Sequence, residues 1–164
     1  MKKTQQILNF EEYDSIDQLN AGDANLLNEA RAATADAYAP YSNFKVGAAA
    51  LLENGLVVRA SNQENASYPV GICAERVLLA TVATQHINMP VSAIAISYNN
   101  VNGESDHPIA PCGMCRQSLA EFESRTMRPI RLILGGMEGK VLVIPEASGL
   151  LPLAFDKTEL DKKV

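Results

Sequence analysis

The apolar positions of this chain change their period several times, and each change predicts a new element of secondary structure. After Asp23, leucine and alanine recur every three or four positions, which predicts a helix with Asp23 as its N-cap. Pro40 ends this helix, because proline lacks the backbone N–H that a continuing helix needs. Residues 1–22 are polar with weak periodicity, so we expect a lead-in segment ahead of a single domain over residues 23–164.

Two strands that form a hairpin are predicted next. The run FKVGAAALL (residues 44–52) is followed by LVVRASN (residues 56–62), and Asn54 with Gly55 supplies the turn between them. Gly47 and the three alanines after it leave the first strand with little side-chain bulk. We therefore expect either a helix or a ligand to pack closely against that strand.

The rest of the chain alternates two buried helices with three apolar strands. The predicted helices are CAERVLLATVATQH (73–86) and CGMCRQSLAEFES (112–124). The predicted strands are VSAIAISY (91–98), IRLILGG (130–136) and KVLVI (140–144). The resulting order, α-β-β-α-β-α-β-β, predicts an α/β fold, a three-layer α/β/α sandwich around a five-stranded mixed sheet.

Composition and charge exclude several classes of protein. The chain of 164 residues is long enough for one domain with its own core. Its formal net charge of −5 is scattered along the sequence, which argues against a nucleic-acid binder. No apolar run has the length of a membrane span, and the start MKKTQQILNF lacks the features of a signal peptide. We expect a cytoplasmic protein whose partners include neither nucleic acid nor a membrane.

Three cysteines are the strongest candidates for chemistry. Cys112 and Cys115 lie three positions apart at the start of one predicted helix, so both thiols can face the same point. Cys73 starts the other buried helix, and helix N-termini favour thiolate over thiol. Three thiolates suit zinc. Glu75, two residues beyond Cys73, is placed to carry protons for a zinc-bound water.

Spacing alone leaves three interpretations of the cysteines open. A C-x-x-C pair is often redox-active, and Cys115 also fits a buried apolar stripe. His107 is a candidate fourth ligand that would complete a closed structural zinc site. Glu75 also fits a first-turn glutamate that the helix dipole favours. Catalytic zinc, structural zinc and redox use all remain possible at this point.

The segments around the cysteines resemble those of the zinc-dependent cytidine deaminases of the small, three-cysteine type. Five blocks carry the resemblance in the order of that family: YSNFKVGAAALL (41–52), NQENASY (62–68), CAER (73–76), PCGMCRQSLAEF (111–122) and LLPLAF (150–155). The resemblance implies a cytidine deaminase-like fold and a hydrolase of pyrimidine salvage. Such an enzyme converts cytidine and deoxycytidine to uridine and deoxyuridine with release of ammonia.

The resemblance also implies roles for the candidate catalytic residues. Cys73, Cys112 and Cys115 would bind one zinc ion per chain. A zinc-bound hydroxide would attack C4 of the cytosine ring while Glu75 shuttles protons to N3 and to the departing amino group. Arg76 would hydrogen-bond the ligand sulfurs and draw charge from them.

Substrate contacts are implied by the same resemblance. The residues concerned are Phe44, Asn62, Glu64, Ala66, Tyr68, Ala74 and Phe155. Asn62 and Glu64 would hold the ribose hydroxyls, Ala66 would lend a backbone N–H to the pyrimidine, and Phe44 would pack against the base. Phe155 and Tyr68 would act across subunit interfaces, which implies a homotetramer with shared active sites.

Overall fold

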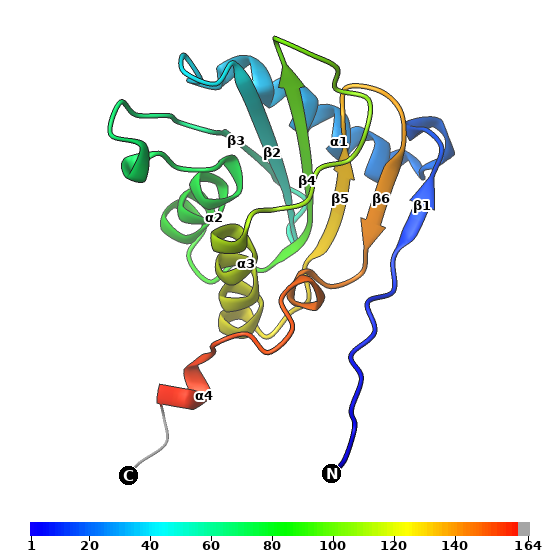
Figure 1. The fold of residues 1–164 in the computed structure, drawn as a ribbon, viewed down its shortest axis with the longest axis vertical. Helices are drawn as coiled ribbons and strands as arrows, with labels where there is room; N and C mark the ends of the chain where they lie inside the picture. The colour runs from blue at the N-terminus through cyan, green and yellow to red at the C-terminus, as the bar shows by residue number, and fades with distance from the viewer. Residues whose placement is uncertain (161–164) are drawn as a thin grey trace.

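Residues 1–160, which this computed structural model describes, form a six-stranded sheet with helices on both faces (Figure 1). The strands are β1 (Glu11–Tyr13), β2 (Phe44–Leu52), β3 (Val57–Ser61), β4 (Val91–Asn100), β5 (Arg131–Gly135) and β6 (Val141–Ile144). Their order across the sheet is β1-β6-β5-β4-β2-β3. Strands β4 and β5 pair in parallel and the other neighbours pair antiparallel, so the predicted mixed sheet is confirmed.

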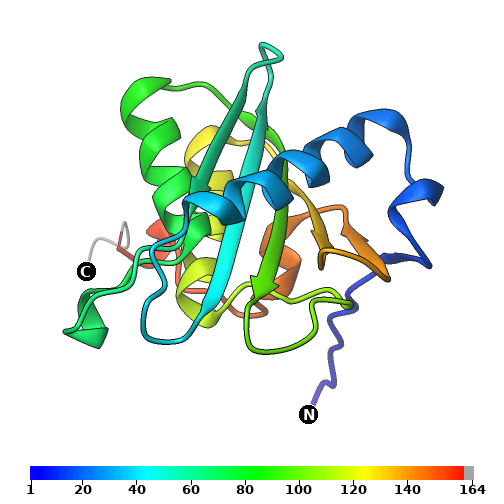
Figure 2. The ribbon, with the colours of Figure 1, turned by 90° about the horizontal axis from the view of Figure 1, so that it is seen from above.

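The helices complete the predicted three-layer sandwich. They are α1 (Ala21–Ala33), α2 (Ala74–Gln85), α3 (Gly113–Thr126) and α4 (Lys157–Leu160), with short 3-10 helices η1 (Ile16–Gln18), η2 (Thr34–Asp36), η3 (Tyr68–Val70) and η4 (Ala147–Leu150). Figure 2 shows α1 lying across one face of the sheet, while α2 and α3 cover the other. Each face has its own apolar core: Leu27 and Ala30 of α1 pack on one side, and Leu78 of α2 and Leu119 of α3 on the other. None of the helices in residues 1–160 combines the length and apolar character needed to cross a membrane.

The predicted number of strands was wrong by one. Strand β1 lies inside the segment expected to be a lead-in, and it pairs with β6, with Glu11 opposite Val143 and Tyr13 opposite Val141. Two of its three residues are glutamates, so the sequence has no apolar alternation that would predict a strand here. The segment forms a strand because its backbone groups pair with those on the open edge of β6.

The start of the first helix also differs from the prediction. The N-cap is Asn20, whose side chain accepts a hydrogen bond from the Asp23 N–H at 3.0 Å. Asp23 therefore lies in the first turn of α1, where its carboxylate pairs with Arg131. Asparagine and aspartate are about equally good N-caps. The apolar pattern therefore predicted the helix but could not decide between Asn20 and Asp23 as its cap.

Gly47 of β2 is where α1 comes closest to the sheet. A Cβ atom there would collide with the carbonyl oxygen of Ala30 and lie 2.7 Å from the backbone nitrogen of Thr34. Of the two partners expected for this bare strand, a helix or a ligand, the structure therefore shows the helix.

The strand directions bring the starts of α2 and α3 together. Because β2 is antiparallel to both β3 and β4, those two strands run parallel to each other. Helix α2 follows β3 in the chain and α3 follows β4, so both helices begin at the carboxyl ends of parallel strands. This edge of an α/β sheet is where ligands commonly bind.

Candidate active site

Three cysteine sulfurs meet where α2 and α3 begin. Cys73 is the N-cap of α2, Cys112 is the N-cap of α3, and Cys115 lies in the first turn of α3. The Sγ atom of Cys112 is 3.8 Å from that of Cys73 and 3.5 Å from that of Cys115. Cys115 is buried, whereas Cys112 is exposed, so the cluster opens to the surface on one side.

The sulfur cluster fits zinc in spacing and in chemistry. A tetrahedral ion with Zn–S bonds near 2.3 Å separates its ligand sulfurs by about 3.8 Å. The separations of 3.8 and 3.5 Å lie close to this value, and all three sulfurs lie within 4.8 Å of one another. Within residues 1–160 no histidine or carboxylate joins the three as a further ligand. Three soft protein ligands with a fourth position left for water or substrate are typical of a catalytic zinc site.

The thiols of the cluster differ in acidity. The pKa of Cys73 is lowered to about 6, chiefly by the hydrogen bond from the Cys115 thiol and further by the hydrogen bond with Cys112 and the positive charge of Arg76. The pKa of Cys115 is raised because its proton is shared with Cys73 and because the group is buried. One thiolate is therefore available near neutral pH, and metal binding would displace the remaining protons.

Glu75 is a buried carboxyl beside this cluster. It lies in the first turn of α2 and is 5% exposed, and its carboxylate does not join the three sulfurs as a ligand. Burial raises its pKa, and the interaction with the Cys115 thiol only partly opposes this effect. A carboxyl whose pKa is raised towards neutrality suits proton transfer in both directions.

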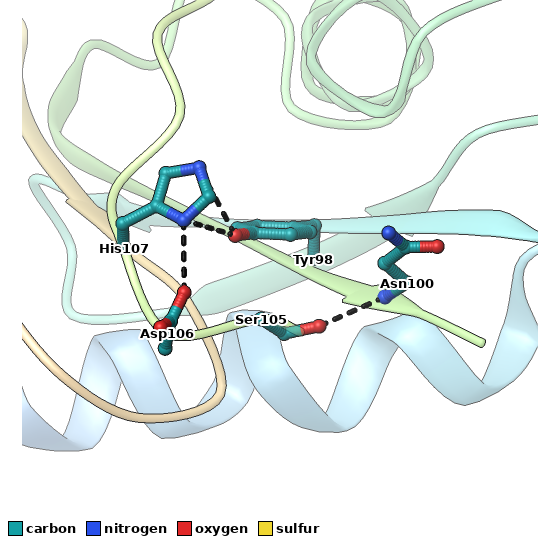
Figure 3. A network of polar contacts seen from close by, with 5 residues as sticks. All are labelled: Tyr98, Asn100, Ser105, Asp106 and His107. Carbon is teal, nitrogen blue, oxygen red and sulfur yellow. Dashed lines mark hydrogen bonds and ion pairs between the residues drawn. The ribbon is translucent and has the colours of Figure 1, made fainter. Parts of the chain in front are cut away.

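His107 and Arg76 are placed differently from the sequence-based alternatives. His107 Nδ1 lies 3.2 Å from the Tyr98 hydroxyl and 3.0 Å from an Asp106 carboxylate oxygen (Figure 3). Its ring does not lie with the three cysteine sulfurs as a further ligand, so the structure does not support its role as fourth ligand. Arg76 lines the groove between α2 and α3. No hydrogen bond joins its guanidinium to a cysteine sulfur within the described residues, so the expected bond to the ligands stays a prediction.

Asn62 is bonded to the backbone at the start of β2. Its side-chain oxygen accepts from the Val46 N–H at 2.8 Å, and its amide nitrogen donates to the Phe44 carbonyl at 3.0 Å. A side-chain amide has two donor hydrogens and two acceptor lone pairs, so one of each remains for a ligand.

Glu64 is bonded to the segment just before β2. Its carboxylate accepts hydrogen bonds from the backbone N–H of Tyr41 at 2.9 Å, from the backbone N–H of Ser42 at 3.3 Å, and from the Ser42 hydroxyl. The Ser42 oxygen in turn accepts from the Phe44 N–H at 3.0 Å. Phe44, Asn62 and Glu64 are thus brought together as one hydrogen-bonded unit. The sequence did not mark Ser42 as a candidate site residue, although serine near a strand start is a known turn-forming signal.

A hollow of about 330 Å³ adjoins this unit. It is lined by Tyr41, Ser42, Glu64, Asn65, Tyr68 and Gly71. The ring of Tyr68 lies 5.9 Å from that of Tyr41, and 74% of the residue is exposed. The hollow therefore includes two of the predicted substrate residues, but not the cysteines.

The other predicted contacts are spread around the site. Ala74 is fully buried directly after Cys73, whereas Ala66 is exposed in the loop that precedes η3. The backbone carbonyl of Phe155 accepts a hydrogen bond from Gln117 of α3 at 2.8 Å, and 60% of the residue is exposed. The structure thus anchors the backbone at Phe155 to α3, while the residue remains largely exposed.

Comparison with known proteins identifies the family of this site. The family model described as the cytidine and deoxycytidylate deaminase zinc-binding region matches residues 21–128. A cytidine deaminase from Halalkalibacterium halodurans is 38% identical over 136 residues, which cover 83% of this chain and 96% of that protein. This chain belongs to the cytidine and deoxycytidylate deaminase family.

Solved cytidine deaminases have the same fold. The enzyme from Burkholderia pseudomallei matches with a TM-score of 0.69 and 43% identity, over 80% of this chain and 97% of that one. The enzyme from Mycobacterium tuberculosis matches with a TM-score of 0.62 and 30% identity, over 84% and 98% of the two chains. The region matched by the family model contains all three cysteines and Glu75, which favours zinc over a redox pair.

Proposed function

We propose that this protein is a zinc-dependent cytidine deaminase that hydrolyses cytidine and deoxycytidine to uridine and deoxyuridine and releases ammonia, as an enzyme of pyrimidine salvage. The observation that carries the proposal is the group of three sulfurs at zinc spacing beside a buried carboxyl that is not a ligand. The relatives named cytidine deaminase support the choice of substrate.

Cys73, Cys112 and Cys115 would hold the metal, and zinc bound there supplies Lewis-acid activation of water at neutral pH. Glu75 accepts a proton from the attacking water and delivers it to N3 of the cytosine ring. Protonation of N3 makes C4 electrophilic enough for water to add. Glu75 then takes the second proton of the added water from the hydroxyl on C4 and passes it to the amino group, which leaves as ammonia while the C4 carbonyl forms.

The part of the site formed by Asn62, Glu64 and Phe44 suits a nucleoside. The hydrogen-bonding capacity that remains on Asn62 and Glu64 is matched to sugar hydroxyls, and Phe44 lies between these residues to pack against the base. Ala66 and Ala74 complete the contacts to the pyrimidine. Glu64 is the only charged residue that lines the hollow within the described part of the chain. Its negative charge disfavours a substrate that carries a phosphate.

The exposed rings at the site support a shared active site. Tyr68 is 74% and Phe155 is 60% exposed, so both residues are available for contact with a second chain. The proposed assembly is a homotetramer in which these two residues reach a neighbouring subunit. Light scattering after gel filtration tests it: the wild type should elute with four times the chain mass, and Phe155→Ala should lower the stability of the assembly. A monomeric wild type would contradict it.

The proposed compartment is the cytoplasm. The three free thiols of the metal site support it, because such thiols survive in a reducing compartment.

The catalytic proposal is tested with purified protein. We expect about one zinc per chain by metal analysis, and loss of the cytosine absorbance with release of ammonia from cytidine. Glu75→Gln should keep the zinc and the fold while kcat falls by about 10²- to 10⁴-fold. Glu121→Gln, an exposed glutamate on α3, is the matched control and should leave zinc content and kcat unchanged. Bound zinc without ammonia release, or full activity of Glu75→Gln, would overturn the proposal.

A further inference from the structure

The ring of Tyr98 packs directly against the ring of Phe44. Tyr98 lies near the end of β4, is 1% exposed, and its ring stacks on that of Phe44 with centroids 4.9 Å apart and planes 15° apart. In the sheet, Phe44 of β2 lies opposite Asn100 of β4, so Tyr98 is its diagonal neighbour on the same face. That face is the one covered by α2 and α3. The orientation of the Tyr98 ring therefore sets the plane on which Phe44 rests.

The Tyr98 hydroxyl is held by one residue. Its oxygen lies 3.2 Å from His107 Nδ1 and 3.5 Å from Nε2, as Figure 3 shows, and His107 also contacts the Asp106 carboxylate. In the described part of the chain, the hydroxyl has no hydrogen-bond partner other than His107. A buried tyrosine hydroxyl without a partner costs stability, so the contact with His107 helps to hold Tyr98 in this orientation.

The loop that carries His107 is held by the β5–β6 turn and by β4. The Ser105 carbonyl accepts from the Glu138 N–H at 3.2 Å, and the Ser105 hydroxyl accepts from the Asn100 N–H at 2.9 Å. A side chain on Gly136 would collide with the Ser105 carbonyl, and one on Gly139 with that of Asp106. The two glycines thus let this turn lie directly against residues 105–107, which fixes the loop that carries His107.

We propose that Tyr98 and His107 are positioning residues that fix the Phe44 ring and thereby the wall of the base pocket. The inference rests on the proposed function, in which Phe44 contacts the cytosine. Neither residue touches the reacting atoms in this arrangement; both act through Phe44. Because Phe44 would contact the base equally in the ground state and in the transition state, their loss should raise KM and leave kcat nearly unchanged.

The first test is kinetic. Tyr98→Phe removes the hydroxyl but keeps the stacked ring, and His107→Ala removes the imidazole that contacts the hydroxyl. Each should raise KM for cytidine by about 3- to 10-fold, with kcat within about 2-fold of the wild type. The double variant should be no worse than either single one, because both remove the same hydrogen bond. His107→Gln restores a partner for the hydroxyl and should recover most of the loss, and Asn102→Ala in the exposed turn of the same loop is the control.

The second test does not need turnover. The aromatic NMR signals of Phe44 are shifted by the ring of Tyr98, so they should move in His107→Ala and stay in place in Asn102→Ala. Unchanged Phe44 signals and an unchanged KM in both single variants would overturn the inference, as would effects on KM that multiply in the double variant. A wild type that binds zinc but does not deaminate cytidine would overturn the proposed function instead, and the NMR comparison would still decide the positioning role.

Discussion

At the scale of single residues, two glutamates near the site carry opposite pKa shifts. Burial raises the pKa of Glu75, whereas the Ser42 hydroxyl, with the N–H groups of Tyr41 and Ser42, lowers the pKa of Glu64. The first shift suits a group that exchanges protons. The second keeps a carboxylate ionised as an acceptor for hydroxyl groups. The same side-chain chemistry thus supports two different roles because the local surroundings differ.

The Glu64 shift makes a prediction for stability against pH. Its folded-state pKa lies below the ordinary value of 4.5, so its ionised form stabilises the fold above that value. This contribution should be lost as the pH falls through the lowered pKa. In thermal melts, the wild type should therefore be more stable than Glu64→Gln at about pH 7, and the difference should be smaller near pH 3, below the ordinary pKa. A difference of the same size at both pH values would show that the carboxylate charge plays no part.

At the scale of elements, a buried carboxylate ties three segments together behind the site. Glu123 of α3 is 7% exposed and accepts hydrogen bonds from the backbone N–H groups of Ile130, Ala147 and Ser148 at 2.6, 2.9 and 2.9 Å. These bonds join the end of α3 to the approach to β5 and to η4. The helix that supplies two of the three cysteines is therefore anchored at its far end.

Replacing this anchor should destabilise the protein. Glu123→Gln keeps the size of the side chain but gives up the charge and one acceptor oxygen, so the free energy of unfolding should fall by about 2 kcal/mol. Urea denaturation measures the change. Glu121→Gln, on the exposed side of the same helix, should shift the midpoint little. Equal midpoints for the two variants would contradict the anchoring role.

The contact between α1 and β2 should be equally sensitive to added volume. Gly47→Ala places a methyl group against the Ala30 carbonyl, so the helix must move away from the sheet. We expect a loss of about 2–3 kcal/mol in the free energy of unfolding. Gly113→Ala is the matched substitution, since nothing lies within 4 Å of its Cβ position, and it should be nearly neutral in the same measurement. A tolerated Gly47→Ala would mean that the helix is free to shift.

At the scale of the whole molecule, β1 and the candidate site lie in different parts of the sheet. Strand β1 forms one edge, and β6 and β5 separate it from β4. It adds three backbone register pairs to β6 and an ion pair between Glu12 and Lys140 at 2.6 Å. Its role is therefore to cover an edge that would otherwise be open to pairing with other chains.

Deletion of residues 1–14 should separate stability from catalysis. The melting temperature should fall by about 5 °C and the tendency to aggregate should rise, because β6 becomes the exposed edge. The kcat/KM for cytidine should stay within about 2-fold of the full chain, since no residue of the site is removed. A melting curve and a deaminase assay on the same preparation decide the matter. A large loss of kcat/KM in a folded variant would show that the segment reaches the site.

The sequence by itself determined the features that depend on near neighbours. Helical periodicity, the Asn54-Gly55 turn and the spacing of Cys112 and Cys115 are local, so the elements, their order and the candidate ligands could be predicted. The resemblance to a family added roles for Glu75 and the substrate residues.

Tertiary structure alone decided the features that join distant parts of the chain. Strand β1 exists because an edge of β6 is open to it, and no apolar pattern marks it. His107 was the possible fourth ligand of a structural zinc site, and the fold instead places it beside the Tyr98 hydroxyl. The bonds of Asn62 and Glu64 around Phe44 likewise depend on which backbone groups come within about 3 Å. Those partners are set by the pairing of strands far apart in sequence, which local periodicity does not encode.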